Sequence, residues 1–247
     1  MRAVAQSIQI IDANTMIGMY PTHRLDMTVE RLVRELDAYH IAASVAVSTI
    51  GVFHDHTLGN AATLDAAKGN NRVIPAATVN PKRWFGSASD MSAIRQQGFR
   101  LFRFFPVEQG WEIDSSAFGE ILEQLAPLNT PIMIDAAESG GPGKVARMTA
   151  DYPAPVVLSS ISPETLTDAL AVMAKMPTVM IEIHELRVPD ALSLIADRVG
   201  ADRVVFGSGA PRRSVAGTLQ YVFSSALSDE DKQKVFGGNI RRVLEAA

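Results

Sequence analysis

Ile10-Ile11-Asp12-Ala13-Asn14-Thr15-Met16-Ile17-Gly18 is an apolar segment that opens with β-branched residues and ends at a turn residue. β-branched side chains favour strands, and glycine punctuates them. The pattern predicts a first strand at about residues 8–12, followed by a turn at Gly18. The polar side chains of Asp12 and Asn14 then lie near the end of this strand.

The remainder of the chain alternates short β-branched runs with helical patterns, which is typical of βα units around a parallel sheet. Further strands are predicted at 43–48, 73–79, 99–104, 131–136, 155–159, 178–184 and 203–206. Thr28 is the predicted cap of the first helix, and 51–56 is predicted to be an irregular loop. Eight evenly spaced units favour an α/β fold that is a single (β/α)8 TIM barrel over residues 1–247, with a doubly wound sheet as the alternative.

Composition limits the function classes. The chain has 247 residues, 47% hydrophobic residues, a net charge of −4 and no cysteine. No basic block suggests nucleic acid, no apolar run is long enough for a bilayer, and no nucleotide, flavin or pyridoxal signature occurs. We therefore expect a cytoplasmic homo-oligomer that binds a small molecule, with no nucleic-acid partner, no membrane partner and no organic cofactor.

Several segments, in order along nearly the whole chain, resemble the amidohydrolase superfamily, in particular the amidohydrolase-2 branch of small single-domain barrels. The segments that carry the resemblance are 11–18, 73–81, 98–102, 203–211 and 237–244. The resemblance implies a metal held by two histidines from the first strand, one each from the fifth and sixth strands, and an aspartate of the eighth that is also the general base.

The corresponding positions of this sequence carry Asn14, Met16, Asp135, Ser159 or Ser160, and Gly209. A thioether is a poor ligand for hard or borderline cations, and zinc needs three or four good donors. We therefore expect no catalytic metal in the usual pocket. The family also contains lactonases that work without a metal, so metal loss does not by itself imply loss of catalysis.

Glu182 and His184 are two residues apart in the seventh strand, so alternation directs both to one face. A histidine beside a carboxylate can act as general acid or base, and Asp135 is the third candidate catalytic residue. The competing interpretation pairs Glu182 with an arginine inside the barrel and makes His184 an ordinary strand-end residue.

Arg100 and Arg103 lie on opposite faces of the fourth strand, and the resemblance favours Arg100 as the inward one. It would clamp a substrate carboxylate or form a buried structural ion pair. The remaining expected substrate-binding residues are Asp12, Asn14, Asn80, Ser160 and Ser208. His54 and His56 are interpreted as a lid or a solvated turn, because no third metal ligand accompanies them.

Two hypotheses follow. The first is an enzyme that acts without metal on a small carboxylated molecule as a hydrolase or lyase, with Glu182 and His184 as acid and base. The second is a catalytically silent paralogue that serves as a binding subunit or as the partner of an active amidohydrolase.

Overall fold

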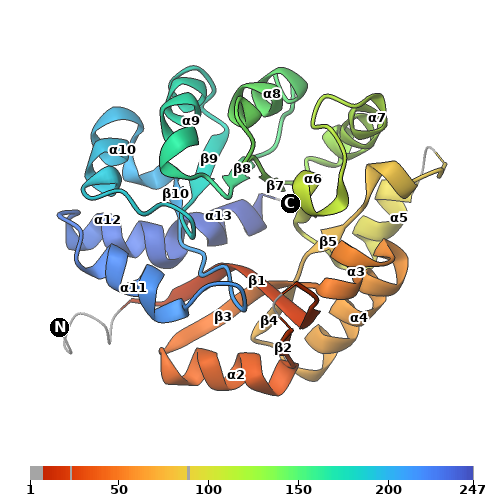
Figure 1. Ribbon diagram of the computed structural model, residues 1–247, viewed down its shortest axis with the longest axis horizontal. Helices are drawn as coiled ribbons and strands as arrows, with labels where there is room; N and C mark the ends of the chain where they lie inside the picture. Colours follow the sequence, from red (N-terminus) through yellow and green to blue (C-terminus); the bar gives the residue numbers. More distant parts are fainter. Residues whose placement is uncertain (1–7, 23, 88–89, 247) are drawn as a thin grey trace.

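The computed structural model describes residues 8–22, 24–87 and 90–246. Its strands are β1 (Ile10–Tyr20), β2 (Leu25–Met27), β3 (Ile41–Ser48), β4 (Val73–Pro75), β5 (Ala77–Thr78), β6 (Phe102–Phe104), β7 (Ile132–Asp135), β8 (Val156–Ser159), β9 (Val179–Glu182) and β10 (Val204–Val205). Figure 1 shows these strands gathered at the centre, with helices around them.

The helices are α2 (Val29–Ala38), α3 (Thr49–Phe53), α4 (His56–Gly69), α5 (Asp90–Gln96), α6 (Pro106–Gln109), α7 (Ser116–Leu125), α8 (Gly141–Met148), α9 (Pro163–Lys175), α10 (Ala191–Val199), α11 (Val215–Phe223), α12 (Asp229–Gln233) and α13 (Asn239–Glu245). Short 3-10 turns cover Pro81–Arg83, Ala126–Leu128 and Ala201–Arg203, and a π-helical turn covers Lys234–Gly238. Thr28 caps α2 as predicted, because its hydroxyl accepts from the backbone of Arg31 at 3.2 Å. Among the described residues, no helix combines the length and apolar character needed to cross a bilayer.

The sheet closes on itself. Two ladders, β2-β1-β3-β4 and β10-β9-β8-β7-β6-β5, meet at Ala76, whose N–H donates to Ala46 while Ala77 donates to Leu101. On the other side, Ala13 donates to Phe206 and Met16 donates to the carbonyl of Ala210. With β4 and β5 as one interrupted strand and β2 as an antiparallel addition, the closed sheet is the predicted (β/α)8 barrel.

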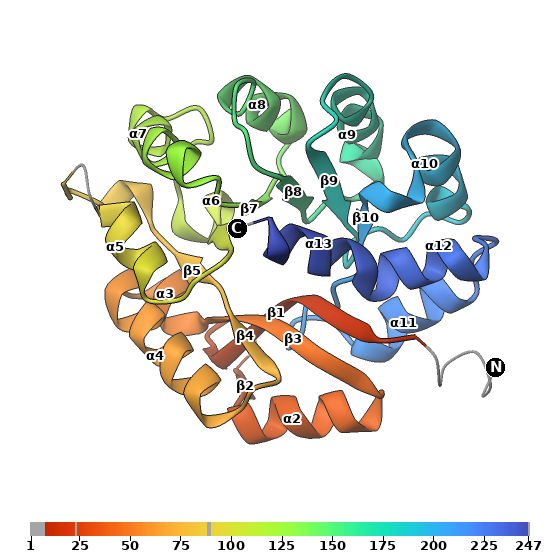
Figure 2. The ribbon, with the colours of Figure 1, turned by 180° about the vertical axis from the view of Figure 1, so that it is seen from behind.

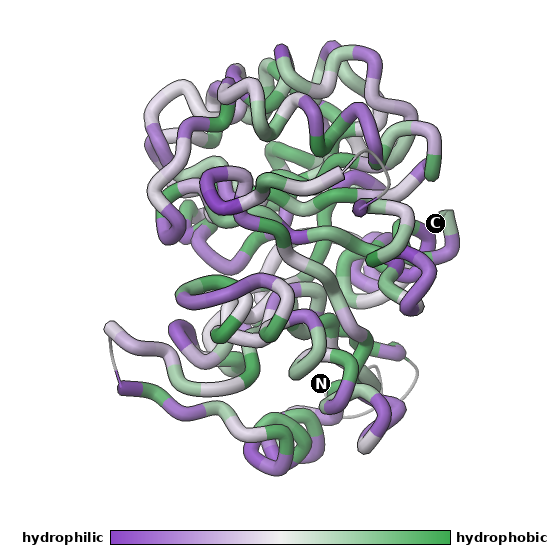
Figure 3. Tube along the Cα trace, turned by 90° about the vertical axis from the view of Figure 1, so that its right-hand side faces the viewer, coloured by the Kyte–Doolittle hydropathy of each residue, from purple (hydrophilic) through white to green (hydrophobic). Residues whose placement is uncertain are grey.

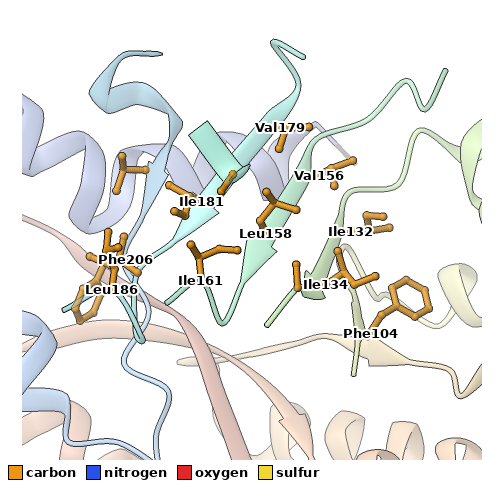
Figure 4. Packing of buried hydrophobic residues seen from close by; sticks show 14 of the residues in the cluster. Phe104, Ile132, Ile134, Val156, Leu158, Ile161, Val179, Ile181, Leu186 and Phe206 are labelled. Carbon is orange, nitrogen blue, oxygen red and sulfur yellow. The ribbon is translucent and has the colours of Figure 1, made fainter. Parts of the chain in front are cut away.

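Alternation along the strands separates two apolar layers. Ile132, Ile134, Val156, Leu158 and Ile181 belong to the layer that includes buried residues of the surrounding helices, and Figure 4 shows their side chains together on neighbouring strands. The opposite set fills the barrel interior and contains Ile11, Ala13, Val45, Ala76, Leu101, Met133, Val157, Met180 and Val205, together with Ile240, Val243 and Leu244 of α13. Figure 2 shows α13 crossing the barrel strands, so its apolar face plugs the interior. Hydrophilic stretches lie mainly at the outside of the trace in Figure 3.

Because side chains alternate along a strand, the residue two positions after an interior residue also faces the interior. This rule sets the direction of the polar side chains at the strand ends. Leu101 is followed two residues later by Arg103, Met133 by Asp135, Val157 by Ser159 and Met180 by Glu182. All four polar residues are buried. Because the carboxyl ends of parallel strands meet at one mouth, these groups converge there.

The prediction of an irregular loop at 51–56 is wrong, because α3 ends at Phe53 and α4 begins at His56, which leaves only 54–55 between them. The predicted turn at Gly18 is wrong as well, because β1 continues through Gly18 to Tyr20. The Ser48 hydroxyl caps α3 by accepting from Ile50, and the Asp55 carboxylate caps α4 by accepting from Leu58 at 2.8 Å. The two helices touch through glycines, since a Cβ built on Gly59 would lie 2.1 Å from the Cα of Gly51.

Candidate functional site

A buried carboxylate–imidazole pair stands at the end of β9. Glu182 Oε2 lies 2.7 Å from His184 Nδ1, and both side chains are at most 1% exposed. The same carboxylate accepts from the backbone N–H of His184 at 2.7 Å and from Asn14 Nδ2 at 2.7 Å. Ser159 Oγ adds a donor at 3.2 Å. Four donors thus fix the Glu182 carboxylate, which in turn fixes the imidazole.

The pair stabilises its own charges. Burial alone would raise the pKa of Glu182, but the neighbouring imidazole and the hydrogen bonds from His184 and Asn14 lower it below its ordinary value. Burial alone would lower the pKa of His184, but the Glu182 carboxylate and, further off, Asp135 raise it. With the carboxylate ionised, the Nδ1 proton is directed at Glu182 and Nε2 is left facing the mouth.

Arg212 covers that free nitrogen. Its Nη2 lies 3.0 Å from His184 Nε2 and 3.5 Å from Glu185 Oε1, while Nη1 lies 3.2 Å from Glu108 Oε1. Burial alone would lower the pKa of Arg212, but Asp135, Tyr20 and Glu108 raise it, so the guanidinium is a permanent cation. A proton on Nε2 would face the N–H groups of this cation. Protonation of His184 and displacement of Arg212 are therefore coupled.

A second guanidinium, Arg103, is 1% exposed. Nη2 donates to Asn14 Oδ1 at 2.7 Å and Nη1 donates to the carbonyl of Thr15 at 3.2 Å, while the guanidinium carbon lies 4.8 Å from the centre of the Phe105 ring. Burial lowers the pKa of Arg103, and Asp135 and Glu182 oppose this shift. Asn14 therefore bridges Arg103 to Glu182.

Asp135 completes the mouth, where its Oδ2 accepts from Ser160 Oγ at 3.0 Å. Asp135, Met16, Gly209 and Arg212 are among the residues around a cavity of only about 10 Å³, which Asn14, Arg103 and His184 also line. A single water needs about this much space. In this conformation the mouth cavity has no room for a substrate.

The donor set at the mouth does not fit a divalent cation. The Asn14 oxygen already accepts from Arg103, the Met16 side chain packs in an apolar cluster, and the mouth cavity carries two guanidinium groups. Gly209 offers no side chain, has φ +72°, and a Cβ on it would lie 2.5 Å from the His184 ring. No group of three or more metal-binding side chains occurs within residues 8–22, 24–87 and 90–246. Whether the protein binds metal stays a prediction.

The expectation that Arg100 points into the barrel is wrong. Arg100 is exposed, whereas Arg103 is buried at the mouth. The physical reason is parity: Leu101 lies in the barrel interior, so the next inward position is 103 and position 100 faces out. The arginine inside the barrel is therefore Arg103, although its partners are uncharged oxygens rather than a carboxylate.

Three expected substrate-binding residues hold backbone in place. Asp12 Oδ1 accepts from the N–H groups of Asn14 at 3.0 Å and Ser208 at 2.9 Å. Ser208 Oγ accepts from Ala210 N, and Asn80 Oδ1 accepts from Lys82 N at the start of a 3-10 turn. Their role in binding substrate stays a prediction.

The two histidines of the predicted lid lie at helix ends. His54 ends α3, is exposed, and its carbonyl accepts from Arg83. His56 begins α4 and lines a separate cavity of about 280 Å³ with Trp84 and Asp90. Neither lines the mouth cavity.

Sequence reasoning missed Arg212, Glu108 and Glu185. Arg212 follows the predicted eighth strand, and residues that bind ligands in such barrels lie after the strands. Its position along the chain therefore could have identified it as a candidate site residue. Glu108 lies in α6 and Glu185 follows β9, and neither segment has a period that predicts side-chain direction.

Comparison with known proteins gave one family match, and no curated protein matches the chain. A family model described as Amidohydrolase matches residues 12–246. The structure is similar to a 5-carboxyvanillate decarboxylase from Novosphingobium aromaticivorans with bound manganese, at 17% identity and a TM-score of 0.76, covering 97% of this chain and 98% of that one.

Two other solved structures have the same architecture. A TIM-barrel protein from Bordetella bronchiseptica is 16% identical, with a TM-score of 0.77 and coverage of 97% of this chain and 99% of that one. A 2,6-dihydroxybenzoate decarboxylase from Rhizobium is 12% identical, with a TM-score of 0.77 and coverage of 96% and 99%. At these identities the likeness establishes the fold.

Proposed function

The chain belongs to the amidohydrolase family, and on that premise we propose that it is a metal-independent lyase or hydrolase of a small carboxylated molecule. The observation that carries the proposal is the buried Glu182–His184 pair. The carboxylate holds the imidazole through Nδ1 and leaves Nε2 directed at the barrel mouth. An imidazole held in this way accepts and returns protons near neutral pH.

Arg212 takes the anchoring role that the sequence had suggested for Arg100. It touches two carboxylates, those of Glu108 and Glu185, together with the acid/base nitrogen of His184. A substrate carboxylate that replaced these contacts would draw the guanidinium away from Nε2, since guanidinium pairs well with carboxylates. Binding of the anion would then free the base.

Two proton-transfer reactions use this arrangement. In hydrolysis, Nε2 takes a proton from water, the water oxygen attacks the carbonyl carbon, and the proton passes to the leaving group. In decarboxylation, protonated His184 donates its proton to the carbon that loses CO2, and the electrons of the broken C–C bond form the new C–H bond. Two of the similar structures are decarboxylases of aromatic acids, which supports the second reaction.

A panel of aromatic acids, lactones and amides, assayed for CO2 and acid release, tests the proposal. Glu182→Gln and His184→Gln should each lower kcat by about 100-fold or more, because general acid–base catalysis contributes at least this much. His40→Asn is the control, since His40 is exposed and its φ of 54° suits asparagine. Full turnover in both site variants would remove the pair from the mechanism.

The second candidate is the catalytically silent paralogue, a binding subunit or partner of an active amidohydrolase. One observation favours it: the mouth cavity measures about 10 Å³ and Arg212 covers Nε2. The two candidates differ in the panel assay. Absence of turnover of every compound in the panel by the wild-type protein would favour the silent protein.

A further inference from the structure

A second cavity adjoins the candidate site. It measures about 530 Å³ and lies between the segment that follows β9 and the helix α11. His184 lines both this cavity and the small one at the mouth, so the two spaces adjoin at this residue. Cavities of roughly 300–1,000 Å³ are typical of small-molecule sites. The space that the mouth lacks is therefore present beside it.

The walls of this cavity are mainly apolar. Ile183, Leu186 and Pro189 line one side, and the ring of Tyr221 lines the other. The Tyr221 hydroxyl donates to the carbonyl of Val188 at 2.8 Å, and burial raises the pKa of Tyr221 to about 12. The hydroxyl thus stays protonated, and its proton is already donated to the carbonyl of Val188. An apolar body fits these walls better than a polar one.

The charge on the rim is positive. Arg213 lines the cavity but is neutralised by Glu185, to which it donates three hydrogen bonds of 2.7 to 2.9 Å. Arg187 also lines the cavity, is exposed, and has no hydrogen bond or ion pair within the described part of the chain. An unneutralised guanidinium beside apolar walls favours an anion, and a carboxylate matches its geometry.

We propose that the cavity between residues 183–189 and α11 binds the apolar body of an aromatic monocarboxylate, held by Arg187 at the rim and placed against His184. The inference rests on the proposed function for its acid–base step, but it makes Arg187, rather than Arg212, the group that holds the carboxylate. The binding site itself stands on its own lining residues. It places the ligand beside the mouth rather than inside it. Specificity is therefore set by residues 183–189 together with α11.

Gly217 allows a direct test. It lines the cavity from α11, and a Cβ built on it meets no atom within 4 Å. Gly217→Phe should therefore place a ring in the cavity with no clash at its Cβ, and loss of a helical glycine favours the helix. The matched control is Gly69→Phe, because a Cβ on Gly69, in α4, likewise meets nothing within 4 Å.

Calorimetry with naphthalene-2-carboxylate and its uncharged amide gives the readout. Wild type should bind the acid, and the amide should bind at least about tenfold more weakly. Gly217→Phe and Arg187→Gln should each weaken binding of the acid by about tenfold or more. Gly69→Phe and Arg198→Gln, which removes an exposed arginine of α10, should bind as wild type does.

Two results would overturn the inference: no binding of the acid by wild type, or binding that Gly217→Phe leaves unchanged. Failure of the proposed function has a different signature. If the acid binds in a Gly217-dependent way but is never turned over, the cavity stands and the enzymatic proposal fails for this acid. If an acid is turned over equally well by Gly217→Phe, the enzymatic proposal stands and the cavity fails.

Discussion

Asp12 is a buried residue whose protonation should be visible in stability. Burial raises its pKa to about 6 from 3.8, against hydrogen bonds from Ser208 and Asn14. Between these two pH values the folded chain holds the proton more tightly than the unfolded chain. The free energy of unfolding therefore falls as pH rises from about 4 to about 6, by about 3 kcal/mol from this group.

Asp12→Asn should remove this slope. The asparagine oxygen can still accept from the N–H groups of Asn14 and Ser208, and the amide replaces Oδ2, which has no partner among the described residues. Urea unfolding at several pH values measures the difference between wild type and variant. As pH rises, the free energy of unfolding of Asp12→Asn should increasingly exceed that of wild type. Asp151→Asn, which changes an exposed residue, should show the same pH dependence as wild type. A difference that does not change with pH would contradict the assignment.

At this scale the sequence predicts what lies close along the chain. Glu182 and His184 are two residues apart, so strand alternation alone put them on one face. The Asn14 bridge could not be predicted, because it joins residues 168 positions apart and depends on barrel closure. Arg212 lies after β10 in an irregular segment, where no period fixes the side-chain direction.

At the scale of elements, the contact between α3 and α4 is the most sensitive to a single methyl group. A Cβ on Gly59 would meet the backbone of Gly51 at 2.1 Å, and backbone cannot move aside as a side chain can. Gly59→Ala should lower the free energy of unfolding by about 3 kcal/mol, as severe overpacking does.

Gly69→Ala, in the same helix, is the control. Its Cβ meets nothing within 4 Å, so the substitution should be neutral or stabilise by up to about 1 kcal/mol. Chemical denaturation of the two variants beside wild type measures both values. Equal stabilities for the two variants would mean that α3 and α4 do not pack as described.

The positions of the elements were mostly predictable, and the exceptions have a common cause. Buried strands carry runs of β-branched residues, which is why the expected strands overlap the observed ones. The segment 51–56 was misread because α3 is short and its helix depends on caps and on the Gly51–Gly59 contact. The break at Ala76, which joins the two ladders, likewise arises only in the closed barrel.

At the scale of the whole molecule, the guanidinium-lined mouth predicts indifference to chelators. A metal that binds the folded state raises the unfolding midpoint by mass action. We expect less than about a tenth of an equivalent of metal per chain after purification without chelator, and no shift of the midpoint with EDTA. Near-stoichiometric zinc, manganese or iron would contradict this, and His54, His56 and His184 would then be replaced first.

The overall architecture was the most predictable level, because eight βα units have few ways to close and the resemblance covers nearly the whole chain. The mouth was less predictable. Its chemistry depends on which side chains from different strands meet, and the resemblance favoured Arg100 as the inward arginine where the structure has Arg103.

Gly209 imposes an order on any redesign of this barrel. The resemblance places an aspartate there, yet a Cβ at this position would lie 2.5 Å from the His184 ring as it now stands. A side chain at position 209 and this imidazole therefore compete for the same space. An attempt to rebuild a metal centre on this scaffold must replace or reorient His184 before it adds a side chain at position 209.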